Sequence, residues 1–219
     1  MASFDLIVFD CDGVLVDSEL LARRAVQSVY RQAGIEVTGA MVDAIVGMKF
    51  ADMLRGLEER TGKTLDAAYH PLFWTQTQAL FTAHLQPMPG IVAFLEASAT
   101  PRCVASSSDH ARIRHSLSVC DLARFFEPDA VFSSHDVARG KPAPDLFLHA
   151  ARRRNVDPAR CLVIEDSRFG ILGAKAAGMT AFGFLGGAHL VGDAGEALRE
   201  ADADFVARSW PEIATRLAG

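Results

Sequence analysis

Short apolar runs alternate with longer amphipathic stretches over most of the chain. Outside residues 18–84, the pattern predicts strands at residues 6–9, 103–105, 130–132, 161–164 and 180–184. It predicts helices at residues 90–97, 109–119, 144–154, 168–177, 194–201 and 211–217. Strands that are apolar along their whole length suit a parallel sheet that is buried on both faces. Because strands and helices alternate, we expect a doubly wound, Rossmann-like α/β fold.

Residues 18–84 differ from the rest, because their apolar positions follow helical spacing and no convincing strand interrupts them. The first helix of this region should end near Gly34, and further helices are expected at residues 40–46, 50–60 and 64–83. Residues 86–90 include two prolines and a glycine, which is typical of a hinge back to the sheet. We therefore predict a Rossmann-like core of residues 1–16 and 86–219 with an inserted α-helical cap of residues 17–85.

The composition is that of a globular protein. Of the 219 residues, 50% are hydrophobic and 22% are charged, and the formal net charge is −5. This charge argues against a nucleic acid or an anionic membrane as the main partner. No apolar stretch approaches the roughly 20 residues that a membrane span needs. The four cysteines are scattered, and the N-terminus has no basic signal-peptide region, so we expect a cytoplasmic protein. A single cap with no extra interaction segment makes a monomer the simplest expectation.

Acidic residues directly follow two of the predicted strands. Asp10 and Asp12 come after the first strand, and Glu165 and Asp166 come after the fourth. The carboxyl ends of parallel strands share one edge of the sheet, where ligands bind. Four carboxylates at one edge repel one another, and a hard divalent cation with oxygen ligands would resolve that repulsion. A single acidic pair would more often only cap a helix, but two pairs predict a Mg²⁺ site.

Other polar residues at the same predicted edge are suited to binding an anion. Ser106, Ser107 and Ser108 follow the second strand and precede a helix, whose N–H groups can hold a phosphate together with the hydroxyls. Ser108 or Asp109 is expected to cap that helix, which leaves Ser106 for the anion. Lys141 lies in a proline-rich turn before another helix, and beside a phosphate and an aspartate it is the expected counter-charge.

Together these segments resemble the four signature motifs of the haloacid dehalogenase superfamily. The motifs are Phe9-Asp10-Cys11-Asp12-Gly13-Val14, Ala105-Ser106-Ser107, Gly140-Lys141-Pro142 and Glu165-Asp166-Ser167. The resemblance covers the whole chain, and their order and spacing make the set specific although each motif alone is weak. The helical insertion resembles the cap of the subgroup that contains β-phosphoglucomutase and many sugar-phosphate phosphatases.

The resemblance implies an enzyme, a Mg²⁺-dependent phosphatase that works through an aspartyl-phosphate. Asp10 would be the nucleophile, which splits one difficult displacement into two easier steps. Asp12 would be the general acid and then the general base, with its backbone carbonyl on the metal. Ser106, Ser107 and Lys141 would hold the transferring phosphoryl group.

The same resemblance implies a metal site that includes Asp10, Asp12 and two later acidic residues. Asp166 would bind Mg²⁺, and Glu165 would ligate the ion directly or through water. The ion would screen Asp10 from the incoming phosphate and stabilise charge in the transition state. The helical cap would close over the substrate and exclude water.

Positions in and near the predicted cap bear on the substrate. In β-phosphoglucomutases a cap histidine assists the mutase step, and Ala22 occupies about that position in this sequence, which favours a phosphatase. Residues 100–104 and 147–151 resemble bacterial 6-phosphogluconate phosphatases. The expected partner is therefore a small phosphorylated metabolite: a sugar, polyol or sugar-acid phosphate such as 6-phosphogluconate. Lys49 matches the substrate-specificity loop of the cap, where it would meet an anionic part of the substrate or be solvated.

Other functions stay open besides a β-phosphoglucomutase-type phosphoryl transfer. A phosphonoacetaldehyde hydrolase would use a cap lysine as Schiff-base nucleophile, and Lys49 lies near the expected place. A true haloacid dehalogenase does not need the second aspartate of the first motif, so Asp12 argues against it. A non-catalytic protein that binds a phosphorylated metabolite is the last alternative, and turnover of any phosphate monoester would exclude it.

Overall fold

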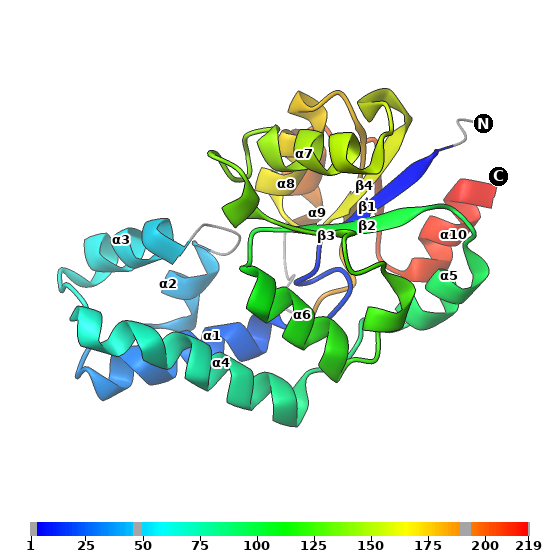
Figure 1. Ribbon diagram of the computed structural model, residues 1–219. Helices are drawn as coiled ribbons and strands as arrows, with labels where there is room; N and C mark the ends of the chain where they lie inside the picture. Colours follow the sequence, from blue (N-terminus) through cyan, green and yellow to red (C-terminus); the bar gives the residue numbers. More distant parts are fainter. Residues whose placement is uncertain (1–3, 46–49, 189–193, 219) are drawn as a thin grey trace.

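The computed structural model describes residues 4–45, 50–188 and 194–218, and its centre is a six-stranded parallel sheet (Figure 1). The strands are β1 (Leu6–Phe9), β2 (Arg102–Ser106), β3 (Val131–Ser133), β4 (Cys161–Glu165), β5 (Thr180–Phe184) and β6 (Phe205–Ala207). Their order is β3-β2-β1-β4-β5-β6, and each neighbouring pair is parallel. The predicted doubly wound α/β fold is confirmed, since the chain winds outward from β1 to both sides.

Helices cover both faces of this sheet. They are α5 (Ile91–Ala97), α6 (His110–Val119), α7 (Asp145–Arg154), α8 (Arg168–Ala176), α9 (Ala194–Glu200) and α10 (Trp210–Ala218). Alternate residues of β1 serve the two layers. Ile7 and Phe9 pack with residues of α5, α6 and α10, whereas Leu6 and Val8 pack with residues of α7, α8 and α9. All four side chains are buried, which is why the strand is apolar along its whole length.

Two elements differ from the sequence-based prediction. The pattern does not predict β6, because only three residues pair with β5 and the preceding segment contains Asp202 and Asp204. The helix expected from residue 64 begins only at His70, as α4 (His70–His84). Pro71 explains this start, because proline fits the first turn of a helix but not its interior. Of the helices in the described part of the chain, none has the length and apolarity needed to cross a membrane.

A separate group of helices lies to one side of the sheet (Figure 1). It consists of α1 (Glu19–Gln32), α2 (Gly39–Asp43), α3 (Phe50–Thr61) and α4, and is called the cap below. These helices enclose an apolar cluster of their own, in which Tyr30 and Leu57 are fully buried. The division into a core of residues 1–16 and 86–219 and a cap of residues 17–85 stays a prediction.

Two segments connect the cap with the sheet, and they lie side by side. The N–H of Met88 donates to the carbonyl oxygen of Leu15 at 2.8 Å, and the N–H of Asp17 donates to that of Gln86 at 3.0 Å. Gly13 turns the chain just after β1 with a φ of 77°, a left-handed conformation that favours glycine. These contacts fix the base of the cap next to the carboxyl end of β1.

Candidate active site

A cavity of about 380 Å³ lies where the carboxyl ends of β1, β2 and β4 face the cap. In an open parallel sheet, ligands bind outside the carboxyl ends of strands, beside the strand at which the winding reverses. The cavity lining includes the predicted site residues Asp10, Asp12, Ser106, Ser107, Lys141, Glu165 and Asp166. The structure thus brings together residues that are up to 156 positions apart in the sequence. Lys49 lies outside the described residues.

Asp10 and Lys141 form a buried ion pair at this edge of the sheet. The Nζ of Lys141 donates to Oδ1 of Asp10 at 2.6 Å, and the two side chains are 2% and 9% exposed. Burial raises the pKa of Asp10 well above its usual value; Lys141 acts against this increase, whereas the charges of Glu165 and Asp166 add to it. Although burial lowers the pKa of Lys141, attraction by Asp10 and Glu165 raises it overall. Lys141 is therefore a stable cation beside Asp10.

Both carboxylate oxygens of Glu165 are occupied by neighbouring groups. Oε1 accepts from the Nζ of Lys141, and Oε2 accepts from the N–H and the hydroxyl of Ser167 at 3.0 and 2.9 Å. The side chain also lies against Gly170, where any added Cβ would overlap it. The oxygens of Glu165 are therefore directed toward Lys141 and the start of α8, and the expectation that Glu165 ligates a metal directly or through water stays a prediction.

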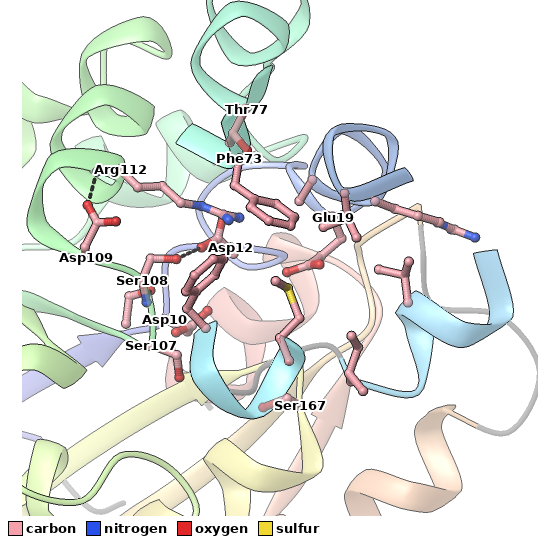
Figure 2. A pocket seen from close by; sticks show the side chains of 18 of the residues that line it. Asp10, Asp12, Glu19, Phe73, Thr77, Ser107, Ser108, Asp109, Arg112 and Ser167 are labelled. Atoms are coloured by element: carbon pink, nitrogen blue, oxygen red, sulfur yellow. Dashed lines mark hydrogen bonds and ion pairs between the residues drawn. The ribbon is translucent and has the colours of Figure 1, made fainter. Parts of the chain in front are cut away.

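Asp12 is held by three donors from three parts of the chain. The hydroxyl of Ser18 donates to Oδ1 at 2.5 Å, and Nη2 of Arg112 donates to the same oxygen at 2.9 Å. The hydroxyl of Ser108 donates to Oδ2 at 2.7 Å. Burial alone would raise the pKa of Asp12. The charge of Arg112 and these hydrogen bonds outweigh burial and hold that pKa below its usual value. Figure 2 shows Arg112 extending from α6 to Asp12, which is therefore ionised and fixed at neutral pH.

The loop after β2 forms a polar wall of the cavity. Ser106 is buried, and its Oγ accepts from the N–H of Ser108 at 3.1 Å. The hydroxyls of Ser133 and Ser134 donate to the carbonyl oxygens of Ser108 and Ser107 at 2.7 and 2.8 Å. Because these carbonyl groups are tied to the end of β3, the loop is held in a defined shape beside Asp10 and Asp12.

The sequence pattern alone does not identify the donors that fix Asp12. Ser18 precedes α1 as an ordinary N-cap would, but its hydroxyl donates to Asp12 and makes no cap bond. Asp109 is the N-cap of α6, since it accepts from the N–H of Arg112 at 2.8 Å. Arg112 therefore lies in the first turn of a helix that starts at the carboxyl edge of the sheet. Its place three residues after the N-cap is a signal that could have made Arg112 a candidate, although it does not show that Arg112 contacts Asp12.

Two carboxylates of the site are suited to a bound cation. Burial, reinforced by the charge of Glu165, raises the pKa of Asp166 well above its usual value, as burial does for Asp10. A positive charge near both groups would stabilise their ionised forms. Asp12 and Glu165 direct their oxygens to other partners. Within the described residues, no three side chains of His, Cys, Asp or Glu surround one point as metal ligands would, and the metal-binding roles expected of Asp10, Asp12, Glu165 and Asp166 stay predictions.

The cap side of the cavity is mostly apolar and aromatic. Phe73, Trp74 and Thr77 of α4 line it, and Ala22 of α1 lies on the same side. Phe73 and Thr77 extend from α4 toward Asp12 and Glu19 (Figure 2). A wall of this kind lowers the local water content and so strengthens electrostatic interactions at the sheet edge.

Comparison with known proteins gives a consistent result. The family model for haloacid dehalogenase-like hydrolases matches residues 4–178. The 6-phosphogluconate phosphatase of Escherichia coli (strain K12) is 32% identical over 192 residues, covering 86% of this chain and 86% of the relative. A fructose-1-phosphate phosphatase of the same strain is 32% identical over 180 residues, covering 80% and 93%. The crystal structure of a haloacid dehalogenase-like protein of unknown function from Agrobacterium tumefaciens str. C58 matches with a TM-score of 0.84 at 33% identity, covering 99% and 100%.

Proposed function

The chain belongs to the haloacid dehalogenase-like hydrolase family, and we propose on that premise that it is a Mg²⁺-dependent phosphatase of a small phosphorylated metabolite. Its substrate would be a sugar, polyol or sugar-acid phosphate such as 6-phosphogluconate, because the relatives at 32% identity are named as phosphatases of 6-phosphogluconate and fructose 1-phosphate. The observation that carries the proposal is the buried pair of Asp10 and Lys141, which shares one cavity with Ser106.

Asp10 is the nucleophile in this proposal. It attacks the phosphorus atom, the bond from phosphorus to the ester oxygen breaks, and an aspartyl-phosphate forms. Lys141 is bonded to Oδ1 of Asp10, so Oδ2 makes the attack, and the lysine charge offsets repulsion between the carboxylate and the phosphate. Ser106 and Ser107, with the N–H groups of their loop, hold the phosphoryl oxygens.

Asp12 moves a proton in both half-reactions. Binding of the phosphate dianion brings negative charge next to Asp12 and raises its proton affinity. Asp12 therefore takes up a proton from solvent when the phosphate binds, and then gives that proton to the departing ester oxygen. In the second half-reaction Asp12 takes a proton from a water molecule, whose oxygen attacks the aspartyl-phosphate, releases phosphate and restores Asp10.

Asp10 and Asp166 are the side chains that would hold Mg²⁺, together with the main-chain carbonyl of Asp12. Mg²⁺ in proteins usually has one or two carboxylate ligands and completes its shell with phosphate oxygens and water, so a site with two carboxylates fits. When bound, the ion supplies positive charge to the phosphoryl group. Glu165 stays with Lys141 and keeps that lysine aimed at Asp10.

We expect Asp166→Asn to raise the melting temperature of the metal-free protein. The raised pKa of Asp166 means that the folded state binds more protons than the unfolded state above a pH of about 4. In EDTA, the stability of the wild type should therefore fall as the pH rises from about 4 through the raised pKa of Asp166 in the folded state. The stability of Asp166→Asn should fall less over the same pH range. Thermal unfolding in EDTA at pH values of about 5 and 8 measures this.

Excess Mg²⁺ should reverse the order of the two proteins. A ligand that binds only the folded state stabilises it by RT ln(1 + [L]/Kd), so the wild type should gain stability and Asp166→Asn should gain little. Asp157→Asn is the control, because Asp157 caps a short turn at the other end of β4. An equal increase in the melting temperature of Asp166→Asn would exclude Asp166 as a ligand.

We expect Gly170→Ala to lower activity, although alanine is the better helix former. A Cβ on residue 170 would lie 1.9 Å from Cδ of Glu165, so the carboxylate must move and release Lys141. Phosphatase kcat/KM should fall roughly 10–10²-fold, as it does when catalytic groups are misplaced. Gly195→Ala in α9 is the matched control. It is also a helical glycine-to-alanine change, but the added Cβ meets a methyl group of Leu185 at 3.0 Å and not Glu165. Unchanged kcat/KM in Gly170→Ala would contradict the role given to Glu165.

Phosphate release from a panel of metabolites, with Mg²⁺ and with EDTA, tests the proposed function. The panel contains 6-phosphogluconate, hexose and polyol phosphates, β-glucose 1-phosphate and phosphonoacetaldehyde. Mg²⁺-dependent release from a sugar or sugar-acid phosphate would support the proposal and identify the substrate. Equal phosphate release in EDTA would overturn the metal requirement. If no substrate of the panel releases phosphate, phosphoryl transfer or a binding role would be favoured instead.

Ala22 supports hydrolysis over a β-phosphoglucomutase-type transfer. It lines the cavity, so the position that would carry the mutase histidine presents only a methyl group.

All four cysteines are buried and unpaired, which supports a reducing compartment and hence a cytoplasmic enzyme. We propose a monomer, and sedimentation of the purified protein tests that state.

A further inference from the structure

Arg112 joins the sheet, the cap and Asp12 at one point. Its Nη2 donates to Oδ1 of Asp12 at 2.9 Å, and its guanidinium lies 5.2 Å from the ring centre of Phe81 in cap helix α4. Phe81 is fully buried, and the side chain of Arg112 is only 22% exposed. A cation that stacks on a buried ring is held in one orientation, so the guanidinium is a fixed partner for Asp12.

The hydrogen bonds to Asp12 are distributed unequally over its two carboxylate oxygens. Oδ1 accepts from both Arg112 and Ser18, whereas Oδ2 accepts from Ser108 among the described residues. A carboxylate has about four lone-pair positions, two on each oxygen, so Oδ1 is filled and Oδ2 keeps one position. Ser108, whose hydroxyl donates to Oδ2, also donates its N–H to the hydroxyl oxygen of Ser106. Since Ser106 is a proposed phosphate-binding residue, Oδ2 is the oxygen on the side of the phosphate site.

Stability alone does not account for this arrangement. The Nε of Arg112 is buried without a hydrogen-bond partner in the described part of the chain, and an unpaired buried N–H opposes folding. Proteins retain such local costs chiefly at functional sites. The position of the guanidinium is therefore explained better by what it does to Asp12 than by its own contacts.

We propose that Arg112 positions Asp12 for proton transfer. By filling Oδ1 together with Ser18, it leaves Oδ2 as the oxygen that exchanges the proton with the leaving group. Arg112 acts through Asp12 and does not touch the substrate in this role. The inference rests on the function proposed above for Asp12. Its consequence is that loss of Arg112 impairs those substrates whose leaving group needs a proton.

The test compares two substrates in Arg112→Met. A sugar or polyol phosphate releases an alkoxide that needs protonation, whereas p-nitrophenyl phosphate releases a stable phenolate that does not. We expect kcat/KM for the sugar or polyol phosphate to fall roughly 10–10²-fold, and that for p-nitrophenyl phosphate to fall about threefold or less. Arg112→Lys should recover part of the loss, because an ammonium can also donate to Oδ1. Arg114→Met, at an exposed position of α6, is the control and should match the wild type on both substrates.

A double variant separates positioning from other roles. In an Asp12→Asn background, Arg112→Met should cause no further loss on the sugar or polyol phosphate, because both changes remove the same proton transfer. Equal loss on both substrates, or a higher KM with unchanged kcat, would overturn the proposal and assign Arg112 to folding or substrate binding. If Arg112→Met does not fold by circular dichroism, Arg112→Gln carries the same comparison. Failure of the wild type to release phosphate from any substrate would instead overturn the proposed function itself.

Discussion

Asp10→Asn should abolish phosphate release, with a loss on the order of 10⁵-fold or more, as expected when the nucleophile of a covalent mechanism is removed. An amide cannot attack phosphorus as a carboxylate does, and no aspartyl-phosphate forms. The substitution keeps the size of the side chain, and the amide oxygen can still accept from Lys141, which donates to Asp10 at 2.6 Å. The variant should therefore fold and retain the cavity while turnover is lost.

Covalent trapping measures the same step directly. Wild-type enzyme that is quenched in acid during turnover should carry one phosphate, located by peptide mass mapping to the segment with Asp10, and Asp10→Asn should carry none. Asp157→Asn is the matched control, because Asp157 is exposed and an asparagine can accept from the N–H of Ala159 as the aspartate does. Turnover within tenfold of the wild type in Asp10→Asn would refute the covalent mechanism.

The sheet could be predicted because its strands are buried on both faces. Ile7 and Phe9 pack on one helical layer while Leu6 and Val8 pack on the other, so the strand has no polar face and its apolar run is visible in the sequence. Strand β6 pairs with β5 alone at the edge of the sheet. Its three residues form too short a run to stand out from the loops around them.

The candidate site could be predicted only as a set of residues that share one edge of the sheet. The motifs place Asp10, Lys141 and Glu165 together, because each follows a strand or precedes a helix at that edge. They do not determine which neighbour each oxygen takes. Glu165 is directed to Lys141 by Ser167, which donates to its other oxygen. Arg112 comes from a separate helix, so its contact with an aspartate 100 positions earlier depends on tertiary packing.

Asp12→Ala should lower kcat/KM for a sugar or polyol phosphate by roughly 10²–10⁴-fold, the usual range for a lost general acid–base group. Without Asp12 the departing alkoxide has no proton donor, and the water of the second half-reaction has no base. With p-nitrophenyl phosphate the loss in kcat/KM should be much smaller, because its leaving group needs no proton. A loss of less than tenfold on the sugar phosphate would mean that protonation of the leaving group does not limit the rate.

The same variant allows a test of the Asp12 contacts that does not depend on activity. The pKa of Asp12 lies below its usual value, so its ionised form stabilises the fold above a pH of about 4, and this contribution is lost as pH falls through the folded pKa. The wild type should therefore melt at a higher temperature than Asp12→Ala at neutral pH, and the difference should shrink in acid. A difference that does not change with pH would mean that Arg112, Ser18 and Ser108 do not hold an ionised Asp12, and the proton transfer at Oδ2 would lose its structural basis.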